Sequence, residues 1–152
     1  MSIEENKEVV KGFLEAVSSI QGDLEKIDTL DKFFSSEFVQ HSSNDVNLDQ
    51  IKLVWPMAFT GFPDMKHEIN DIIAEGDKVV VLFTTTGTHK GYLGNVPPSN
   101  NKITYSSTDT FRVSNGKIQE EWPQSDILTS FQQMGILPSN EEFIQAYVDS
   151  LE

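Results

Sequence analysis

The chain has 152 residues, which is enough for one domain with a buried core and too few for two ordinary domains. Its formal net charge of -13 argues against nucleic acid or an anionic membrane as a partner, because basic surfaces bind both. The lack of cysteine excludes disulfides, thiolate catalysis and cysteine-ligated metal sites.

The start of the sequence, Met-Ser-Ile-Glu-Glu-Asn, has neither the basic lead nor the apolar run of a signal peptide. No apolar segment approaches the roughly 20 residues that a membrane-spanning helix needs. We therefore expect a cytoplasmic protein. Because the sequence contains no repeat and no linker, we expect residues 1–152 to form a single domain.

Helical periodicity dominates the first sixty residues. Ser2 and Glu5 form a capping box that predicts a first helix, and apolar residues follow at helical spacing. A second helical stretch begins near Asp23. A third helix is capped by Asn47, and Pro56 inside it predicts a kink or a split.

From Met65 onward the hydrophobic period changes to two, which predicts strands. Asn115-Gly116 is a strong hairpin signal, a short helix ends at Gly135, and Ser139 caps a last helix. Helices followed by strands and then short helices indicate an α+β fold with an antiparallel sheet. The expected strands cover residues 65–74, 78–88, 102–113 and 117–125.

The strand over residues 78–88 carries apolar side chains on both faces. The N-terminal helices can cover one face, and the other face needs a second cover. A second copy of the chain would supply it, which predicts a homodimer through the sheet. The alternative, which the residues leave equally open, is that the terminal helix over residues 140–150 covers this face.

Two segments place titratable side chains next to strand ends, namely Gly87-Thr88-His89 and Glu121-Trp122-Pro123-Gln124-Ser125-Asp126. An acid and an imidazole at the ends of neighbouring strands could transfer protons on a small apolar molecule. Strand parity puts Trp122 and Asp126 on one face. A carboxylate beside an indole is poorly hydrated, and this would raise its pKa toward neutrality.

A sheet curled around three amphipathic helices would collect one set of side chains inside a cone. Aromatic walls with a few polar groups are typical of a small-molecule pocket. The aromatic residues that we expect to bind a substrate there are Trp55, Phe59, Phe83, Tyr105 and Trp122.

From the residues alone, structural roles compete with these functional ones. Asp126 precedes a helix, where aspartate is a favoured N-cap. His89 reads as a solvated loop residue and His41 as a buried hydrogen-bonding residue. Glu121 is expected on a solvated strand, and Asp109 either has a function or faces water. The three histidines have no metal-ligand spacing, so we expect no metal site.

Several short motifs, taken in order and spacing, resemble those of SnoaL-like polyketide cyclases. The resemblance runs from the first helix to about Leu137, which is nearly the whole chain. The motifs are Phe62-Pro63-Asp64-Met65, Ile73-Ala74-Glu75-Gly76-Asp77-Lys78-Val79, Gly87-Thr88-His89-Lys90-Gly91, Phe111-Arg112-Val113, Gly116-Lys117-Ile118, Glu121-Trp122, Asp126 and Gln133-Met134-Gly135-Ile136.

The resemblance implies the fold of nuclear transport factor 2, an α+β cone or barrel in which helices pack on a strongly curved antiparallel sheet. It implies a cofactor-free enzyme that closes a ring by intramolecular aldol condensation. The family's general acid/base falls on Asp126, its Gly-Thr-His histidine falls on His89, and a pocket-lining histidine falls on His41.

The resulting hypothesis is acid–base chemistry on a small apolar carbonyl compound. Asp126 removes a proton next to the carbonyl group, and His89 hydrogen-bonds the carbonyl or orients the aspartate. A related isomerase, dehydratase or hydrolase would use the same groups. A non-catalytic small-molecule binding protein is the alternative from another class.

Overall fold

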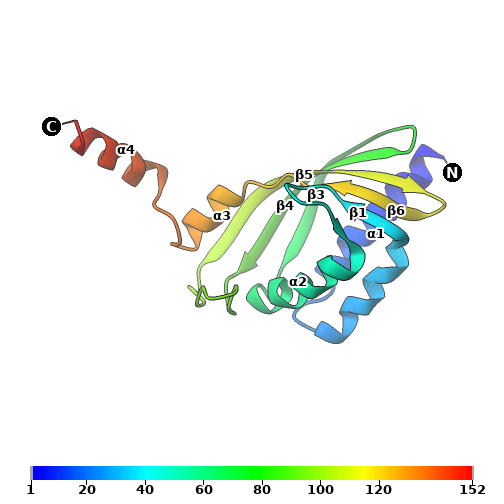
Figure 1. Cartoon of the computed structure of the whole chain (residues 1–152), viewed down its shortest axis with the longest axis horizontal. Coiled ribbons are helices and arrows are strands. Elements are labelled where there is room, and N and C mark those ends of the chain that lie inside the picture. Colours follow the sequence, from blue (N-terminus) through cyan, green and yellow to red (C-terminus); the bar gives the residue numbers. More distant parts are fainter. Residues whose placement is uncertain (1, 152) are drawn as a thin grey trace.

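The computed structural model describes residues 2–151, in which helices pack on one face of a curved sheet (Figure 1). None of the helices in this part of the chain is long and apolar enough to cross a membrane. The elements in chain order are α1 (Ile3–Ser18), the 3₁₀ helix η1 (Leu24–Phe33), β1 (Phe34–Gln40), β2 (Val46–Asn47), α2 (Leu48–Gly61), β3 (Lys66–Glu75), β4 (Lys78–Thr88), β5 (Lys102–Ser114), β6 (Lys117–Trp122), α3 (Ile127–Gln133) and α4 (Asn140–Asp149).

The sheet confirms the expected α+β class and extends it. Within the described chain its strand order is β2-β1-β6-β5-β4-β3, and every pairing is antiparallel except that of β1 with β6. The four expected strands are β3 to β6. β1 and β2 were missed, because residues 34–40 directly follow a helical stretch. The sheet stays open instead of closing into a barrel, since β2 and β3 form its two edges.

The N-terminal helix forms where the sequence predicts it. Ser2 and Glu5 form the expected capping box at the start of α1. The Ser2 side chain accepts from the Glu5 backbone N–H, and the Glu5 side chain accepts from the Ser2 backbone N–H. Its buried side chains, Phe13 among them, pack on the inner face of the sheet, with the Phe13 ring centroid 5.0 Å from that of Phe34. This packing makes one continuous core from α1, β1 and the long strands.

The next two helical segments differ from each other in type. The stretch that begins near Asp23 is a 3₁₀ helix, with the Asp23 side chain accepting from the backbone of Glu25. Asn47 and Gln50 form a capping box for α2. Pro56 does not split α2, which runs as one element from Leu48 to Gly61, so that part of the expectation is wrong.

Strand β6 contains an irregularity that decides which side chains enter the interior. Val113 pairs with Ile118, but Arg112 pairs with Glu120, so one residue of β6 is skipped. After this bulge the parity of the strand is reversed. Glu121 therefore lies opposite the buried Phe111, on the inner face. The expectation that Trp122 shares the inner face is wrong, because Trp122 pairs with the outward-facing Thr110.

The outer face of the sheet is less apolar than the sequence suggested. Val80 is half-buried and Ile73 and Leu82 are exposed, while much of β4 and β5 presents threonine and serine hydroxyls there. The alternative that the terminal helix covers this face is wrong for the single chain. Helix α4 extends away from the body and leaves all of its side chains exposed (Figure 1).

The loop between β4 and β5 is fastened to the end of α2. The backbone N–H groups of Lys90 and Gly91 both donate to the carbonyl oxygen of Gly61, at 2.8 and 3.2 Å. A Cβ at position 91 would lie 2.4 Å from the carbonyl oxygen of Thr60, so only glycine permits this approach. The contact holds Leu93 beside α2, and the Leu93 side chain helps to line a hollow there.

Candidate functional site

An inner cavity of about 240 Å³ lies between the helices and the inner face of the sheet. It adjoins a wider hollow of about 490 Å³ between α2, the start of β2 and the β4–β5 loop, which we call the vestibule. The two spaces are direct neighbours, because both are lined by Gln40, Trp55, Ala58, Met65 and Tyr105. This arrangement fits a small molecule that enters through the vestibule.

Two carboxyl groups face the inner cavity. Glu121 lies directly across from Phe111, and Asp109 comes two residues before Phe111 on the same face of β5. The two acids are therefore diagonal neighbours, with Cβ atoms about 7 Å apart by sheet geometry. Asp109 is 7% and Glu121 is 8% exposed. Two carboxyls this close and this buried do not both ionise easily.

Burial sets the charge of each acid. Burial raises the pKa of Asp109 to about 6, against the opposing effect of a 3.0 Å hydrogen bond from the Gln124 backbone N–H. Burial and the charge of Asp109 raise the pKa of Glu121 to about 8, although the Gln40 amide donates to Glu121 at 2.8 Å. The pKa of Glu121 is raised further than that of Asp109, so Asp109 is the first of the two carboxyls to ionise as the pH rises.

A row of three polar side chains crosses the sheet beside these acids. His67, Thr85 and Tyr105 occupy paired positions on β3, β4 and β5. The His67 Nδ1 lies 3.0 Å from the Thr85 hydroxyl, and burial lowers the pKa of His67 to about 4, which keeps this imidazole neutral. Burial, and then the charge of Asp109, raises the pKa of Tyr105, so its hydroxyl stays protonated and can donate.

The remaining wall of the cavity is mainly apolar. The expected aromatic residues Trp55, Phe59, Phe83 and Tyr105 all line it, together with side chains of α1. Apolar walls around a carboxylate hinder its solvation and favour proton transfer with a bound molecule. Contact of these aromatic side chains with a substrate remains a prediction.

The structure does not bring Asp126 and His89 together at this cavity. Asp126 is exposed at the N-terminus of α3, where its carboxylate accepts from the Thr129 hydroxyl at 2.7 Å and from the Thr129 N–H at 3.1 Å. These hydrogen bonds lower the pKa of Asp126. His89 is fully buried beside Phe62, and its Nδ1 accepts from the Ser99 N–H at 3.2 Å.

His41 and Trp122 also lie outside the inner cavity. Their rings stack with centroids 4.7 Å apart and an interplanar angle of 17°. His41 Nε2 lies 3.1 Å from Glu120, and His41 Nδ1 lies 3.3 Å from Asp45. The Lys78 ammonium lies 4.9 Å from the Trp122 ring centroid. This cluster therefore fastens the β1–β2 loop, which forms part of the vestibule rim, to β6.

Sequence reasoning missed the roles of Glu121 and His67 and left Asp109 open. For Asp109 a signal was present, because a lone acid in an apolar and hydroxyl-rich strand is costly to bury without a function. For Glu121 the signal depended on the bulge in β6, which reverses strand parity. The sequence pattern did not single out His67, which is half-buried with its ring edge-on to Phe83.

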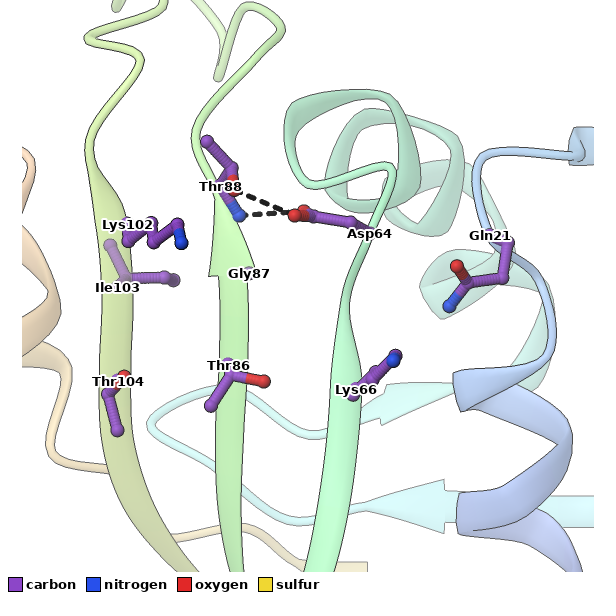
Figure 2. A pocket seen from close by; sticks show the side chains of 9 residues that line it. All are labelled: Gln21, Asp64, Lys66, Thr86, Gly87, Thr88, Lys102, Ile103 and Thr104. Carbon is purple, nitrogen blue, oxygen red and sulfur yellow. Dashed lines mark hydrogen bonds between the residues drawn. The ribbon is translucent and has the colours of Figure 1, made fainter.

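A separate hollow of about 360 Å³, distinct from the inner cavity and the vestibule, lies toward the outer face of the sheet (Figure 2). Lys66, Lys102 and several threonines line it. Its carboxylate, Asp64, accepts hydrogen bonds from the N–H and from the hydroxyl of Thr88, both at 2.7 Å. This hollow lacks the paired acids and the apolar walls of the inner cavity. Across residues 2–151, no group of three His, Asp or Glu side chains could hold a metal ion.

Replacing Asp126 with asparagine separates capping from catalysis at this position. Asparagine caps helices about as well as aspartate, so we expect Asp126→Asn to fold normally and to keep its activity. Asp126→Ala removes the cap and should lower the melting temperature by a few degrees. Thermal unfolding and turnover of both variants check this, and loss of turnover in the well-folded Asp126→Asn would restore Asp126 as the catalytic acid.

Three solved structures share this architecture. AclR from Streptomyces galilaeus, provisionally named a hydroxylase, is 24% identical, with a TM-score of 0.83 over 99% of this chain and 93% of its own. A SnoaL-like protein from Jannaschia sp. CCS1, provisionally named a polyketide cyclase, is 23% identical, with a TM-score of 0.78 over 91% and 97% of the two chains. IdmH from Streptomyces antibioticus, another provisional polyketide cyclase, is 27% identical, with a TM-score of 0.72 over 86% and 98%.

A search of curated proteins found no match. The sequence pattern described as SnoaL-like polyketide cyclase matches residues 4–134, which include every element from α1 to α3. The match spans most of the chain and agrees with the fold. The chain therefore belongs to the SnoaL-like polyketide cyclase family.

Proposed function

We propose that the protein catalyses acid–base chemistry on a small, enolisable carbonyl compound bound in the inner cavity. One observation carries this proposal: the buried carboxyl groups of Asp109 and Glu121 are neighbours on the wall of one mostly apolar cavity, and burial raises the pKa of both. A base and an acid with pKa values on either side of neutrality are what proton transfer near pH 7 requires. Membership of the polyketide cyclase family supports a carbonyl substrate.

The aldol reaction assigns a step to each group. The Asp109 carboxylate takes a proton from the carbon next to a carbonyl, and the electron pair of the broken C–H bond moves toward the carbonyl oxygen. Glu121 or the Tyr105 hydroxyl donates a hydrogen bond to that oxygen as it gains charge. The enolate carbon then attacks a second carbonyl of the same molecule, and the new alkoxide receives the proton that Asp109 had taken, which restores the carboxylate. The sequence of steps balances without an oxidant or a reductant.

The pair Asp126 and His89 remains the rival assignment. It rests on the family resemblance, whereas the geometry favours Asp109 and Glu121, because only these two carboxyls face the inner cavity among the described residues. The shared mechanism is proton abstraction next to a carbonyl group. Variants of Asp109 and Asp126 distinguish the two assignments in one assay.

We also propose a homodimer. Contact through the outer face of the sheet remains a prediction, although Ile73, Val80 and Leu82 offer it only a small apolar patch. The larger exposed apolar surface belongs to α4.

Exchange of substrate protons with deuterated water tests the proposed function. A panel of mono-, bi- and tricyclic ketones is incubated with the protein, and nuclear magnetic resonance follows loss of the proton next to each carbonyl. We expect catalysed exchange for at least one ketone, with a rate that rises through pH 6 as Asp109 ionises and falls above pH 8 as Glu121 loses its proton.

Binding of a ketone without exchange at any pH would contradict the enzymatic proposal. It would favour a small-molecule binding protein, because the cavity would then be used without proton transfer. A rate that stays constant between pH 5 and 9 would exclude Asp109 and Glu121 as the responsible groups.

A further inference from the structure

Helix α4 presents an apolar stripe that nothing in the single chain covers. The stripe follows helical spacing, and none of the ten residues of α4 is buried. A helix this short is marginal in water without a packing partner. The exposed stripe, extended by one residue beyond the helix, consists of Phe143, Ile144, Tyr147, Val148 and Leu151.

The segment that carries α4 is fixed in direction. We call residues 136–151 the arm. The Gln132 side-chain amide donates to the Pro138 carbonyl at 2.8 Å and to the Asn140 side chain at 3.0 Å. The Ile136 N–H donates to the Phe131 carbonyl at 2.9 Å. These bonds hold the arm away from the body of its own chain (Figure 1).

A matching uncovered surface lies at the rim of the vestibule. On α2, Leu53 is 83% exposed, and Val54 and Met57 are exposed beside it. Val54 and Met57 line the vestibule together with Leu93. The rim and the stripe are thus both apolar, and each is uncovered in the single chain.

We propose that α4 of a second copy lies across the vestibule, and that the two copies exchange their arms. A second copy fits because each chain carries both the stripe and the rim, which is what a two-fold symmetric contact requires. Half-exposed aromatic and aliphatic side chains on one arm offer roughly 500 Å², so two arms would bury roughly 1,000 Å² of their own surface. The rim surface that they cover adds to this area, which brings the total into the range of a stable dimer.

The exchange would complete the ligand site. With the partner's arm over the vestibule, a bound molecule is enclosed and water is kept from Asp109 and Glu121. This consequence rests on the proposed function, whereas the contact itself does not. The dimer can therefore be tested without measuring turnover.

Cross-linking tests the contact directly, because the chain contains no cysteine. Untagged Ile144→Cys protein is mixed with tagged Leu53→Cys protein and treated with a short bismaleimide. We expect a mixed cross-linked dimer in good yield. Gln145→Cys, which lies off the stripe, is the matched control and should yield at least tenfold less. Cross-linking of Ile144→Cys to Ile73→Cys instead would place the arm on the sheet and overturn the proposal.

Sedimentation equilibrium gives an independent readout. We expect wild-type protein at twice the chain mass of 17.1 kDa, and Ile144→Ser combined with Tyr147→Ser at the chain mass. Gln145→Ser should remain dimeric. A monomeric wild type, a dimeric double variant, or cross-links formed only within one copy of an Ile144→Cys and Leu53→Cys double variant would each overturn the proposal.

Discussion

Replacing Asp109 with asparagine is expected to lower turnover of an exchanging ketone by about 10²–10⁴-fold, the usual contribution of a general base. Asparagine has the same shape and can still accept the 3.0 Å hydrogen bond from the Gln124 backbone. It cannot take a proton. The change therefore removes the proposed base while leaving the wall of the inner cavity in place.

The pH profile makes this test specific. Wild-type activity should rise through pH 6, where Asp109 ionises, and the residual activity of Asp109→Asn should lack that rise. The matched control is Asp71→Asn, an exposed position on β3, and it should retain the wild-type rate and profile. Wild-type turnover by a folded Asp109→Asn would remove Asp109 from the mechanism.

Local rules in the sequence predicted much of the fold. Capping boxes identified the starts of α1, α2 and α4, and the change to a period of two identified the strands β3 to β6. Both signals act within a few residues, so they can be read without knowing the tertiary structure. Strand β1 carries a weak local pattern and forms by pairing with the distant strand β6. Strand β2 is only two residues long and pairs with the nearby end of β1.

The site was harder to predict because it depends on register. One skipped residue in β6 turns Glu121 inward and Trp122 outward, and the sequence gives no local sign of it. Simple alternation therefore assigned the wrong residues to the interior. Asp109 lies on a regular strand, where simple alternation puts it on the same face as Tyr105.

The resemblance and the local physics disagreed about Asp126. Its position before a helix indicated a cap, and it is a cap with both carboxylate oxygens bonded to Thr129. The resemblance gave it a catalytic role, for which the structure offers no contact with the inner cavity among the described residues. Family membership thus supports the fold, while the identity of the acid and base requires the geometry of this chain.

Replacing Glu121 with glutamine is expected to stabilise the protein at alkaline pH. Folding raises the pKa of Glu121 from 4.5 to about 8, so the folded chain binds more protons than the unfolded chain between these values. The stabilisation from this group is complete below pH 4.5 and is lost as pH rises through 8. The shift corresponds to roughly 3–5 kcal/mol of unfolding free energy. Glutamine stays neutral and can still accept from the Gln40 amide.

Denaturant unfolding at several pH values measures this difference. At pH 4 to 5 the two proteins should be similar in stability, because Glu121 is then protonated and has nearly the same shape as glutamine. At pH 9 Glu121→Gln should be more stable by a few kcal/mol, and its stability should fall less steeply with pH. Glu68→Gln, at an exposed position on β3, should follow the wild-type curve. Parallel curves for wild type and Glu121→Gln would mean that Glu121 ionises as freely in the folded chain as in water, and the proposed acid would then be absent at pH 7.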